Sequence, residues 1–250
     1  MSLKYLLKKK YRLSCIITLI TATALLLNIW VSFAHTSETE ESMQKARSRM
    51  VARQIKRRGI KDLSVINAML KVKRHLFVPE KMIPYAYQDH ALSIGHKQTI
   101  SQPYIVALMT ELLEIKKDDS VLEIGTGSGY QAAILGELAQ DVYSIEIIQA
   151  LGKKTGQLLK SLEYKNIHLR IGNGYQGWPE HAPFDKIIVT AAPDHIPKPL
   201  IEQLKTGGRL VIPVGKSHQK LLLIRKDKNG VKRENIIAVR FVPMTGEAEK

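Results

Sequence analysis

The chain has 250 residues, of which 44% are hydrophobic and 6% aromatic, a composition that fits one globular domain and excludes wholesale disorder. The only cysteine, Cys15, excludes a disulfide scaffold and a cysteine-based zinc cluster. The net charge of +15 is compatible with nucleic acid, a membrane surface or acidic protein substrates as partners.

The first 34 residues are predicted to lie outside the folded domain. Five cations stand within the first twelve residues, and the stretch 13–34 then carries no charge. Ser32 and Ala34 place small residues at positions −3 and −1 of a cleavage site, which is typical of a signal peptide. The same stretch is long enough to span a bilayer as an uncleaved anchor, and a buried core helix is the least favoured alternative. Both favoured alternatives export the rest of the chain, to the periplasm or to a membrane-anchored position.

A second basic region follows the first. Removing residues 1–34 takes away five positive charges and no negative ones, so the remaining 216 residues keep a net charge of +10. Most of this surplus lies between residues 45 and 74, where the only acid is Asp62 and the cations are Lys45, Arg47, Arg49, Arg53, Lys56, Arg57, Arg58, Lys61, Lys71, Lys73 and Arg74. This region is either a solvated helix face or a surface that attracts acidic partners.

Apolar residues at helical spacing predict a helical N-terminal region. One helix is expected over 43–58, with Gly59 as its stop, and a second after Asp62, which suits an N-cap. Residues 85–103 are expected to be irregular, and a further amphipathic helix is expected over 105–113.

The hydrophobic period then changes to that of strands alternating with helices. Short β-rich runs are expected at 121–124, 142–145, 167–171, 187–189 and 210–212, with helices near 130–139, 149–162 and 197–204. This alternation predicts a doubly wound α/β fold with a mostly parallel sheet. Runs at 221–224 and 236–242, with a turn signal at 228–230, predict an antiparallel C-terminal hairpin. We therefore divide the chain into 1–34, a helical preface with an active-site loop at 35–103, and a ligand-binding domain at 104–250.

A glycine-rich loop follows the first strand of this domain. Gly125, Gly127 and Gly129 alternate directly before a predicted helix, an arrangement that lets a ligand lie against bare backbone. Tyr130 replaces the third glycine of the dinucleotide fingerprint, and there is no P-loop lysine. Glu146, at the tip of the next strand, can accept hydrogen bonds from ribose hydroxyls. These features favour a nucleoside ligand over a turn without a ligand.

With these residues the chain resembles class I S-adenosylmethionine-dependent methyltransferases, and more specifically the protein-L-isoaspartate O-methyltransferases, from about Met50 to Gly246. The stretches 98–103 (QTISQP) and 239–246 (VRFVPMTG) carry the identification, because the glycine loop occurs in many methyltransferases. The resemblance implies a Rossmann-like fold. It also implies methyl transfer from S-adenosyl-L-methionine to the free carboxylate of L-isoaspartyl residues in damaged proteins, with D-aspartyl residues as a further candidate. It implies no metal and no specific nucleic acid, and we expect a monomer; the family is generally cytoplasmic.

The resemblance also implies roles for individual residues. Ser101 matches the active-site serine, and Glu146 matches the acid that binds the ribose. The loop along the methionine part of the cofactor corresponds to Glu123, Gly125, Thr126, Gly127 and Ser128, and the adenine end to Asn173 and Gly174. The residues expected at the peptide substrate are Ile94, Thr99, Ser101, Arg240, Phe241, Val242 and Thr245.

Three features depart from the family's pattern. Ser93 and Lys97 stand where Pro and Gly are usual, and Asn173 stands where Asp is usual. An amide can accept a bond from the adenine amino group without charge assistance, so we expect weaker cofactor binding, which Asn173→Asp would restore by up to about fivefold. The third departure is the predicted export segment.

The expected reaction needs no general base, because a carboxylic acid of pKa about 4 is already ionised at neutral pH. Alignment of the reacting atoms is then the main task, and Ser101 can hold one carboxylate oxygen while the other attacks. The histidines show no metal-ligand spacing. Two alternatives stay open: a nucleic-acid methyltransferase, suggested by the basic region, and a non-catalytic exported binding protein that keeps the fold.

Overall fold

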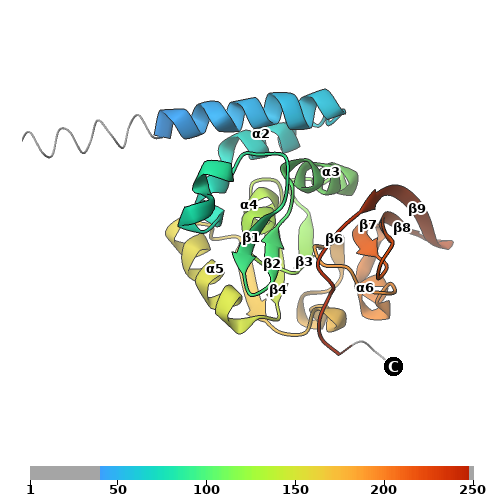
Figure 1. Ribbon diagram of the computed structural model, residues 1–250. Coiled ribbons are helices and arrows are strands. Elements are labelled where there is room, and N and C mark those ends of the chain that lie inside the picture. Colours follow the sequence, from blue (N-terminus) through green and yellow to red (C-terminus); the bar gives the residue numbers. More distant parts are fainter. Residues whose placement is uncertain (1–39, 248–250) are drawn as a thin grey trace, which may run out of the picture. The chain divides into compact units, whose positions relative to one another are not determined.

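The computed structural model describes residues 40–247 (Figure 1). The chain divides into two compact units after Ala46. In the first unit, residues 40–46 are helical and Lys45 Nζ lies 2.6 Å from Glu41 Oε1. The predicted signal peptide or anchor at 1–34 lies outside the described residues. None of the helices within 40–247 has the length and apolar character needed to cross a membrane.

The second unit begins with the helical preface. The helix over residues 47–50 continues as the π-helical turn η1 (Val51–Ile55) and the 3-10 turn η2 (Lys56–Arg58). It ends at Gly59 with φ 97°, so the predicted stop is confirmed. The N-cap prediction is also confirmed, since Asp62 Oδ1 accepts the Ser64 N–H at 2.8 Å at the start of α2 (Leu63–Lys71). Two 3-10 turns follow, η3 (Arg74–Phe77) and η4 (Glu80–Tyr85).

The segment predicted to be irregular contains a small antiparallel hairpin, so that prediction is wrong over these residues. Strand β1 (Leu92–Gly95) pairs with β2 (Gln98–Ile100), and α3 (Pro103–Leu113) follows directly. His96 and Lys97 form the turn with φ of 51° and 58°. Left-handed turns usually carry Gly or Asn, and neither residue marks this turn in the sequence.

The central sheet has seven strands in the order β5-β4-β3-β6-β7-β8-β9. The first five of these are parallel, and the last two are antiparallel, as predicted for a doubly wound fold that ends in a hairpin. Figure 1 shows this order from β4 to β9, left to right. The strands are β3 (Ser120–Ile124), β4 (Asp141–Glu146), β5 (Ile167–Ile171), β6 (Phe184–Val189), β7 (Leu204–Val214), β8 (Gln219–Asp227) and β9 (Gly230–Val239).

Helices cover both faces of the sheet. Successive residues of a strand point to opposite faces, so each strand contributes side chains to the core on both sides. In β3, Val121 packs in a cluster with Leu113 of α3, whereas Leu122 packs in another with Leu200 of α6. Both faces are therefore hydrophobic, as a parallel sheet requires. The remaining helices are α4 (Tyr130–Gly136), α5 (Gln149–Ser161) and α6 (Lys198–Glu202).

The C-terminal strand begins and ends earlier in the chain than predicted, at Gly230 and Val239. It ends at Val239, and the chain then crosses to the carboxyl end of β6. Gln219 bonds both backbone groups of Phe241, and the Ala192 N–H donates to the Val242 carbonyl at 2.8 Å. These contacts take residues 240–242 away from the edge of the sheet and toward the glycine loop.

Candidate functional site

The candidate site lies where the strand order reverses. The chain leaves β3 toward β4 on one side, and β6 lies on the other, which is the position where open α/β sheets bind ligands. A pocket there is built from the hairpin, the glycine loop, the end of β4 and the C-terminal segment. Its lining includes Gln98, Thr99, Ser101, Gly125, Thr126, Gly127, Ser128, Gln131, Glu146, Gly174, Thr190, Val242, Met244 and Thr245.

The glycine loop has a backbone that other residues rarely adopt. Gly125, Gly127 and Gly129 have φ values of 98°, 53° and 86°. A Cβ atom at Gly125 would lie 2.5 Å from Thr190 Oγ1, so there is no room for a side chain. The Gly125 N–H donates to the Ile145 carbonyl at 2.8 Å, which fixes the start of the loop. The pocket therefore has a wall of bare backbone.

Glu146 ends β4 and both braces the loop and lines the pocket. It is 4% exposed; its Oε2 accepts the Gly127 N–H at 2.7 Å and its Oε1 accepts the Ile148 N–H at 2.8 Å. Each carboxylate oxygen has two lone pairs, so each can still accept a hydroxyl from a ligand. A pair of ribose hydroxyls matches this capacity.

Glu123 lies beneath the loop and not in the wall of the pocket. It is fully buried in β3, and its Oε2 accepts the Ser144 hydroxyl, which in turn lies 2.6 Å from Thr126 Oγ1. Burial raises the pKa of Glu123 to about 8; the Ser144 bond opposes this shift and the charge of Glu146 adds to it. The other oxygen, Oε1, has no hydrogen-bond partner among the described residues. Glu123 thus contacts the loop through Ser144 and Thr126.

The backbone of Ser101 is held by Arg74, which was expected from the sequence only as part of a basic region. Arg74 is fully buried; its Nη2 donates to the Ser101 carbonyl at 2.7 Å and its Nε to the Ala86 carbonyl at 2.8 Å. Its guanidinium lies 4.9 Å from the Tyr130 ring centroid. Burial lowers the pKa of Arg74 to about 10, an effect that Tyr130 and Tyr87 oppose, so the group stays charged at neutral pH. No motif in the sequence separates Arg74 from its exposed neighbours.

A second cavity, the adjoining groove, shares Ser101 and three other lining residues with the pocket. Thr99, Ser101, Thr190 and Val242 line both cavities. The rest of the groove is formed by Asp89, His90, Ala91, Gln102, Ile105, Ala238, Val239, Arg240 and Phe241. The structure therefore brings together most of the residues predicted for the substrate, with Thr245 on the pocket side.

Besides Glu123, two further predicted site residues lie outside the pocket and the groove. Ile94 is 8% exposed, lies against Gly127 and lines a separate small cavity with Pro79 and Leu158. Asn173 does not line the pocket, although the adjacent Gly174 does.

Asn173 bonds instead within the chain. Its Oδ1 accepts the Tyr175 N–H at 3.1 Å, and its Nδ2 donates to the Glu247 carbonyl at 2.8 Å. Asn173 thereby ties down the chain just after Met244 and Thr245, which line the pocket. Across residues 40–247, no group of three or more His, Cys, Asp or Glu side chains could hold a metal ion.

The comparisons with known proteins agree with this geometry. A family model described as protein-L-isoaspartate(D-aspartate) O-methyltransferase matches residues 45–249. The chain is 52% identical over 202 residues to a protein-L-isoaspartate O-methyltransferase of Picosynechococcus sp., covering 81% of this chain and 91% of that relative. It is 59% identical over 186 residues to protein-L-isoaspartate O-methyltransferase 1 of Nitrosospira multiformis, covering 73% and 79%.

Solved structures give the same result. The chain matches a protein-L-isoaspartate O-methyltransferase with a TM-score of 0.74 and 29% identity, covering 80% of this chain and 66% of that one. It also matches a protein from Plasmodium falciparum in complex with S-adenosyl-L-homocysteine, with a TM-score of 0.70 and 28% identity, covering 80% and 98%.

Proposed function

The chain belongs to the protein-L-isoaspartate(D-aspartate) O-methyltransferase family, and on this basis we propose that it is a repair methyltransferase. It transfers a methyl group from S-adenosyl-L-methionine to the free carboxylate of L-isoaspartyl residues in damaged proteins, with D-aspartyl residues as a further substrate. One observation carries the proposal at the level of geometry. A pocket with a glycine wall and a strand-tip acid shares Ser101 with a groove lined by the C-terminal segment.

The residues of the pocket fit this methyl donor. The bare backbone at Gly125 and Gly127 admits a ligand where a side chain would clash, and Glu146 keeps acceptor capacity for two ribose hydroxyls. The loop from Gly125 to Ser128 would hold the methionine part, and Gly174 would lie at the adenine end. When bound, the donor supplies a methyl group on a sulfonium, which is an excellent leaving group.

The chain's own contribution to the reaction is alignment and exclusion of water. The substrate carboxylate is ionised at neutral pH, so no side chain has to remove a proton. The Ser101 hydroxyl donates to one carboxylate oxygen and leaves the other free to form the new carbon–oxygen bond as the carbon–sulfur bond breaks. Arg74 donates a hydrogen bond to the Ser101 carbonyl, which fixes the backbone position from which the Ser101 hydroxyl extends. Such positioning can supply about 7–11 kcal/mol in favourable cases.

Substrate selection would come from the backbone of the peptide. An isoaspartyl residue continues the chain through its side chain, and its free carboxylate hangs where the main chain would run. Residues 239–242 line the groove, and those of their backbone groups that Gln219 and Ala192 do not occupy could pair with such a peptide by strand addition. Recognition would then depend little on neighbouring side chains.

Matched peptides with isoaspartate or aspartate test the proposal through methyl transfer from labelled donor. We expect transfer to the isoaspartyl peptide and little to its twin, and equal rates would refute the substrate. Ser101→Ala should lower turnover by about 10- to 150-fold, the value of a charge-assisted hydrogen bond. The dissociation constant of S-adenosyl-L-homocysteine should stay the same, and a proportional loss would assign Ser101 to cofactor binding instead.

The location and assembly of the protein are separate parts of the proposal. We assign export to residues 1–34, as a cleaved signal or as a membrane anchor, with a cytoplasmic enzyme as the alternative, and we expect a monomer. Cell fractionation with N-terminal sequencing of the isolated protein separates these alternatives. An intact Met1 in the soluble cytoplasmic fraction would rule out export.

A further inference from the structure

The helix that ends at Gly59 presents a row of cations without acidic partners. No acidic residue occurs from 43 to 61. Arg49, Arg53 and Arg57 follow one another at intervals of four residues, so they lie on one side of the helix, and Lys56 flanks them. We call these four residues the basic stripe. All four are exposed, while Met50, Val51 and Ile55 are buried against the rest of the unit.

Arg58 and Arg47, two other cations in this region, have structural partners among the described residues, whereas the stripe has none there. Arg58 pairs with Asp89 at 3.2 Å and stacks on the Tyr104 ring, and Arg47 is buried with its Nη1 3.4 Å from Tyr87 Oη. Within the part of the chain that the structure describes, the four residues of the stripe form no ion pair or hydrogen bond through their side chains. Like charges four residues apart destabilise a helix by about 0.2–0.5 kcal/mol per pair. The stripe therefore costs stability without a compensating ion pair among the described residues.

The position of the stripe in the chain favours a lipid surface as its partner. Only fourteen residues separate the uncharged stretch 13–34 from Arg49. A short tether of this kind would keep the stripe at a high effective concentration near a bilayer that holds the uncharged stretch. In Figure 1 the light-blue part of the helix runs along the upper edge of the drawing with α2 beneath it, and the four side chains of the stripe are exposed. A flat anionic surface can reach all three turns of the stripe at once.

We infer that the basic stripe docks the protein on an anionic lipid bilayer. Each Lys or Arg near such a surface strengthens binding by roughly fivefold, so four of them give a salt-sensitive attachment of moderate strength. This inference does not depend on the methyltransferase activity, since none of the four residues lines the pocket or the groove.

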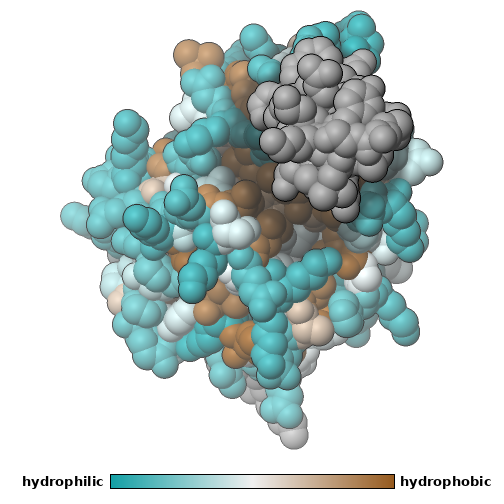
Figure 2. Space-filling view, turned by 90° about the vertical axis from the view of Figure 1, so that its left-hand side faces the viewer, coloured by the Kyte–Doolittle hydropathy of each residue, from teal (hydrophilic) through white to brown (hydrophobic). Residues whose placement is uncertain are grey.

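Co-flotation of the full chain with vesicles tests the inference. One set of vesicles is phosphatidylcholine alone and the other contains about one third phosphatidylglycerol, each at low and high salt. The test variant replaces Arg49, Arg53, Lys56 and Arg57 by Gln. The matched control replaces Lys153, Lys154, Lys160 and Lys165 by Gln, which removes the same charge from exposed positions at α5 and just after it. Figure 2 shows the side of the molecule that carries α5, where hydrophilic residues predominate.

The wild type and the α5 control should bind the anionic vesicles at low salt at least about tenfold more tightly than the stripe variant, and high salt should abolish the difference. The uncharged stretch 13–34 is present in all three proteins, so it cannot create this difference. Equal losses in both variants would overturn the inference, because only net charge would then matter. Equal binding of the wild type and the stripe variant to the anionic vesicles would overturn it as well. Binding of the stripe to a 20-base-pair DNA duplex in preference to vesicles would also overturn it. Methylation of a soluble peptide should be unchanged in the stripe variant.

Discussion

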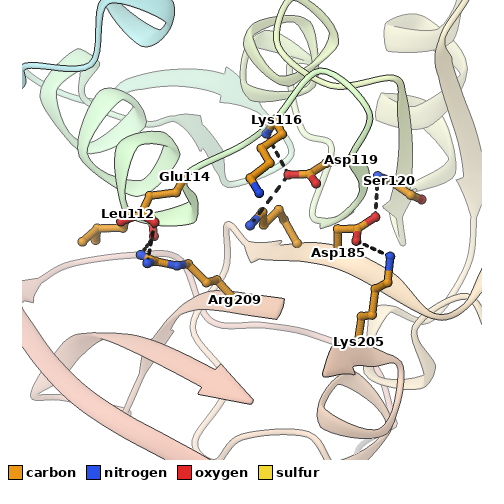
Figure 3. Close-up of polar contacts among 9 residues, drawn as sticks. Leu112, Glu114, Lys116, Asp119, Ser120, Asp185, Lys205 and Arg209 are labelled. Carbon is orange, nitrogen blue, oxygen red and sulfur yellow. Dashed lines mark hydrogen bonds and ion pairs between the residues drawn. The ribbon is translucent and has the colours of Figure 1, made fainter. Parts of the chain in front are cut away.

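The amino and carboxyl ends of the central sheet hold their acidic side chains in different ways. At the amino ends of β3 and β6, Asp185 Oδ1 accepts Lys205 Nζ at 2.7 Å and its Oδ2 accepts the Ser120 N–H at 3.1 Å (Figure 3). Nearby, Asp119 accepts the Lys116 N–H at 2.8 Å. At the carboxyl ends, Glu123 and Glu146 have no cationic partner among the described residues, only hydroxyl and N–H donors.

This difference appears in the pKa values of Asp185 and Glu123. Partial burial acts to raise the pKa of Asp185, but the bonds from Lys205 and Ser120 outweigh it, and the net shift is downward. Burial dominates at Glu123, whose pKa rises to about 8. The paired acid at the amino end therefore contributes stability, whereas the carboxyl end buries Glu123 beneath the loop at a cost in stability. Glu146 and the bare backbone of the loop are the groups there that face the pocket.

The largest effect on stability is expected from a substitution of Arg74. This residue lies outside the sheet and holds the backbone of Ser101 at the pocket by a hydrogen bond. Arg74→Met removes two buried hydrogen bonds and leaves the carbonyls of Ala86 and Ser101 unpaired, at about 1–3 kcal/mol each. We expect unfolding free energy to fall by roughly 2–5 kcal/mol and turnover to fall in the protein that remains folded. Denaturant titration measures the first effect, and single-turnover methyl transfer measures the second. Full turnover in folded Arg74→Met would show that Ser101 holds its place without Arg74.

Alanine substitutions at two glycines, one at each end of the sheet, allow the two ends to be compared directly. Gly125 and Gly207 both have left-handed φ, but a Cβ atom clashes with Thr190 only at Gly125, and nothing lies within 4 Å of the position at Gly207. Gly207→Ala should cost about 1–2 kcal/mol, the price of the backbone conformation alone. Gly125→Ala should cost about 1 kcal/mol more and weaken binding of S-adenosyl-L-homocysteine at least about tenfold. Calorimetry on both variants checks this, and equal affinities would mean that the loop does not face the ligand.

The pH dependence of stability should have opposite signs at the two ends. Between pH 4.5 and about 8 the folded state keeps a proton on Glu123 that the unfolded state has lost, so unfolding free energy falls as pH rises. The slope is at most about 1.4 kcal/mol per pH unit, and Glu123→Gln should remove it. Asp185, with a lowered pKa, contributes stability above pH 3.8 that is lost as pH falls. Denaturant titrations from pH 3 to 9 on wild type, Glu123→Gln and Asp185→Asn separate the two contributions, and an unchanged slope in Glu123→Gln would mean that Glu123 is ionised when folded.

The features that could be predicted from sequence are those whose cause is local. The periodicity of hydrophobic residues predicted the parallel sheet, and the alternating glycines predicted the loop at 125–129. Both patterns involve residues that lie within a few positions of one another in the sequence. Arg74 could not be found this way, since its partners Ala86 and Ser101 are 12 and 27 residues away and an isolated arginine suggests an exposed position. The β1–β2 hairpin was missed because its turn at His96 and Lys97 contains no glycine.

At Asn173 the structure predicts the opposite effect of an aspartate on cofactor affinity from the one expected from the family pattern. The Tyr175 N–H can only donate and the Glu247 carbonyl can only accept, so their bonds fix the orientation of the amide. An aspartate could still cap Tyr175, but its second oxygen would face the Glu247 carbonyl oxygen. The hydrogen bond at this place would then be replaced by repulsion between two oxygen atoms. The segment that carries Met244 and Thr245 along the pocket would then lose its tie.

We therefore expect Asn173→Asp to weaken binding of S-adenosyl-L-homocysteine by up to about fivefold, or roughly 1 kcal/mol, where the family pattern alone predicted tighter binding. Calorimetric titration measures the affinity, and hydrogen exchange at residues 243–247 should rise in the same variant. Asn173→Ser is the matched control, because a serine keeps the cap on Tyr175 and is too short to reach Glu247. If the tie is responsible, the serine and aspartate variants lose protection together. Tighter binding in Asn173→Asp with unchanged exchange would instead support direct contact between an acid at this position and the ligand.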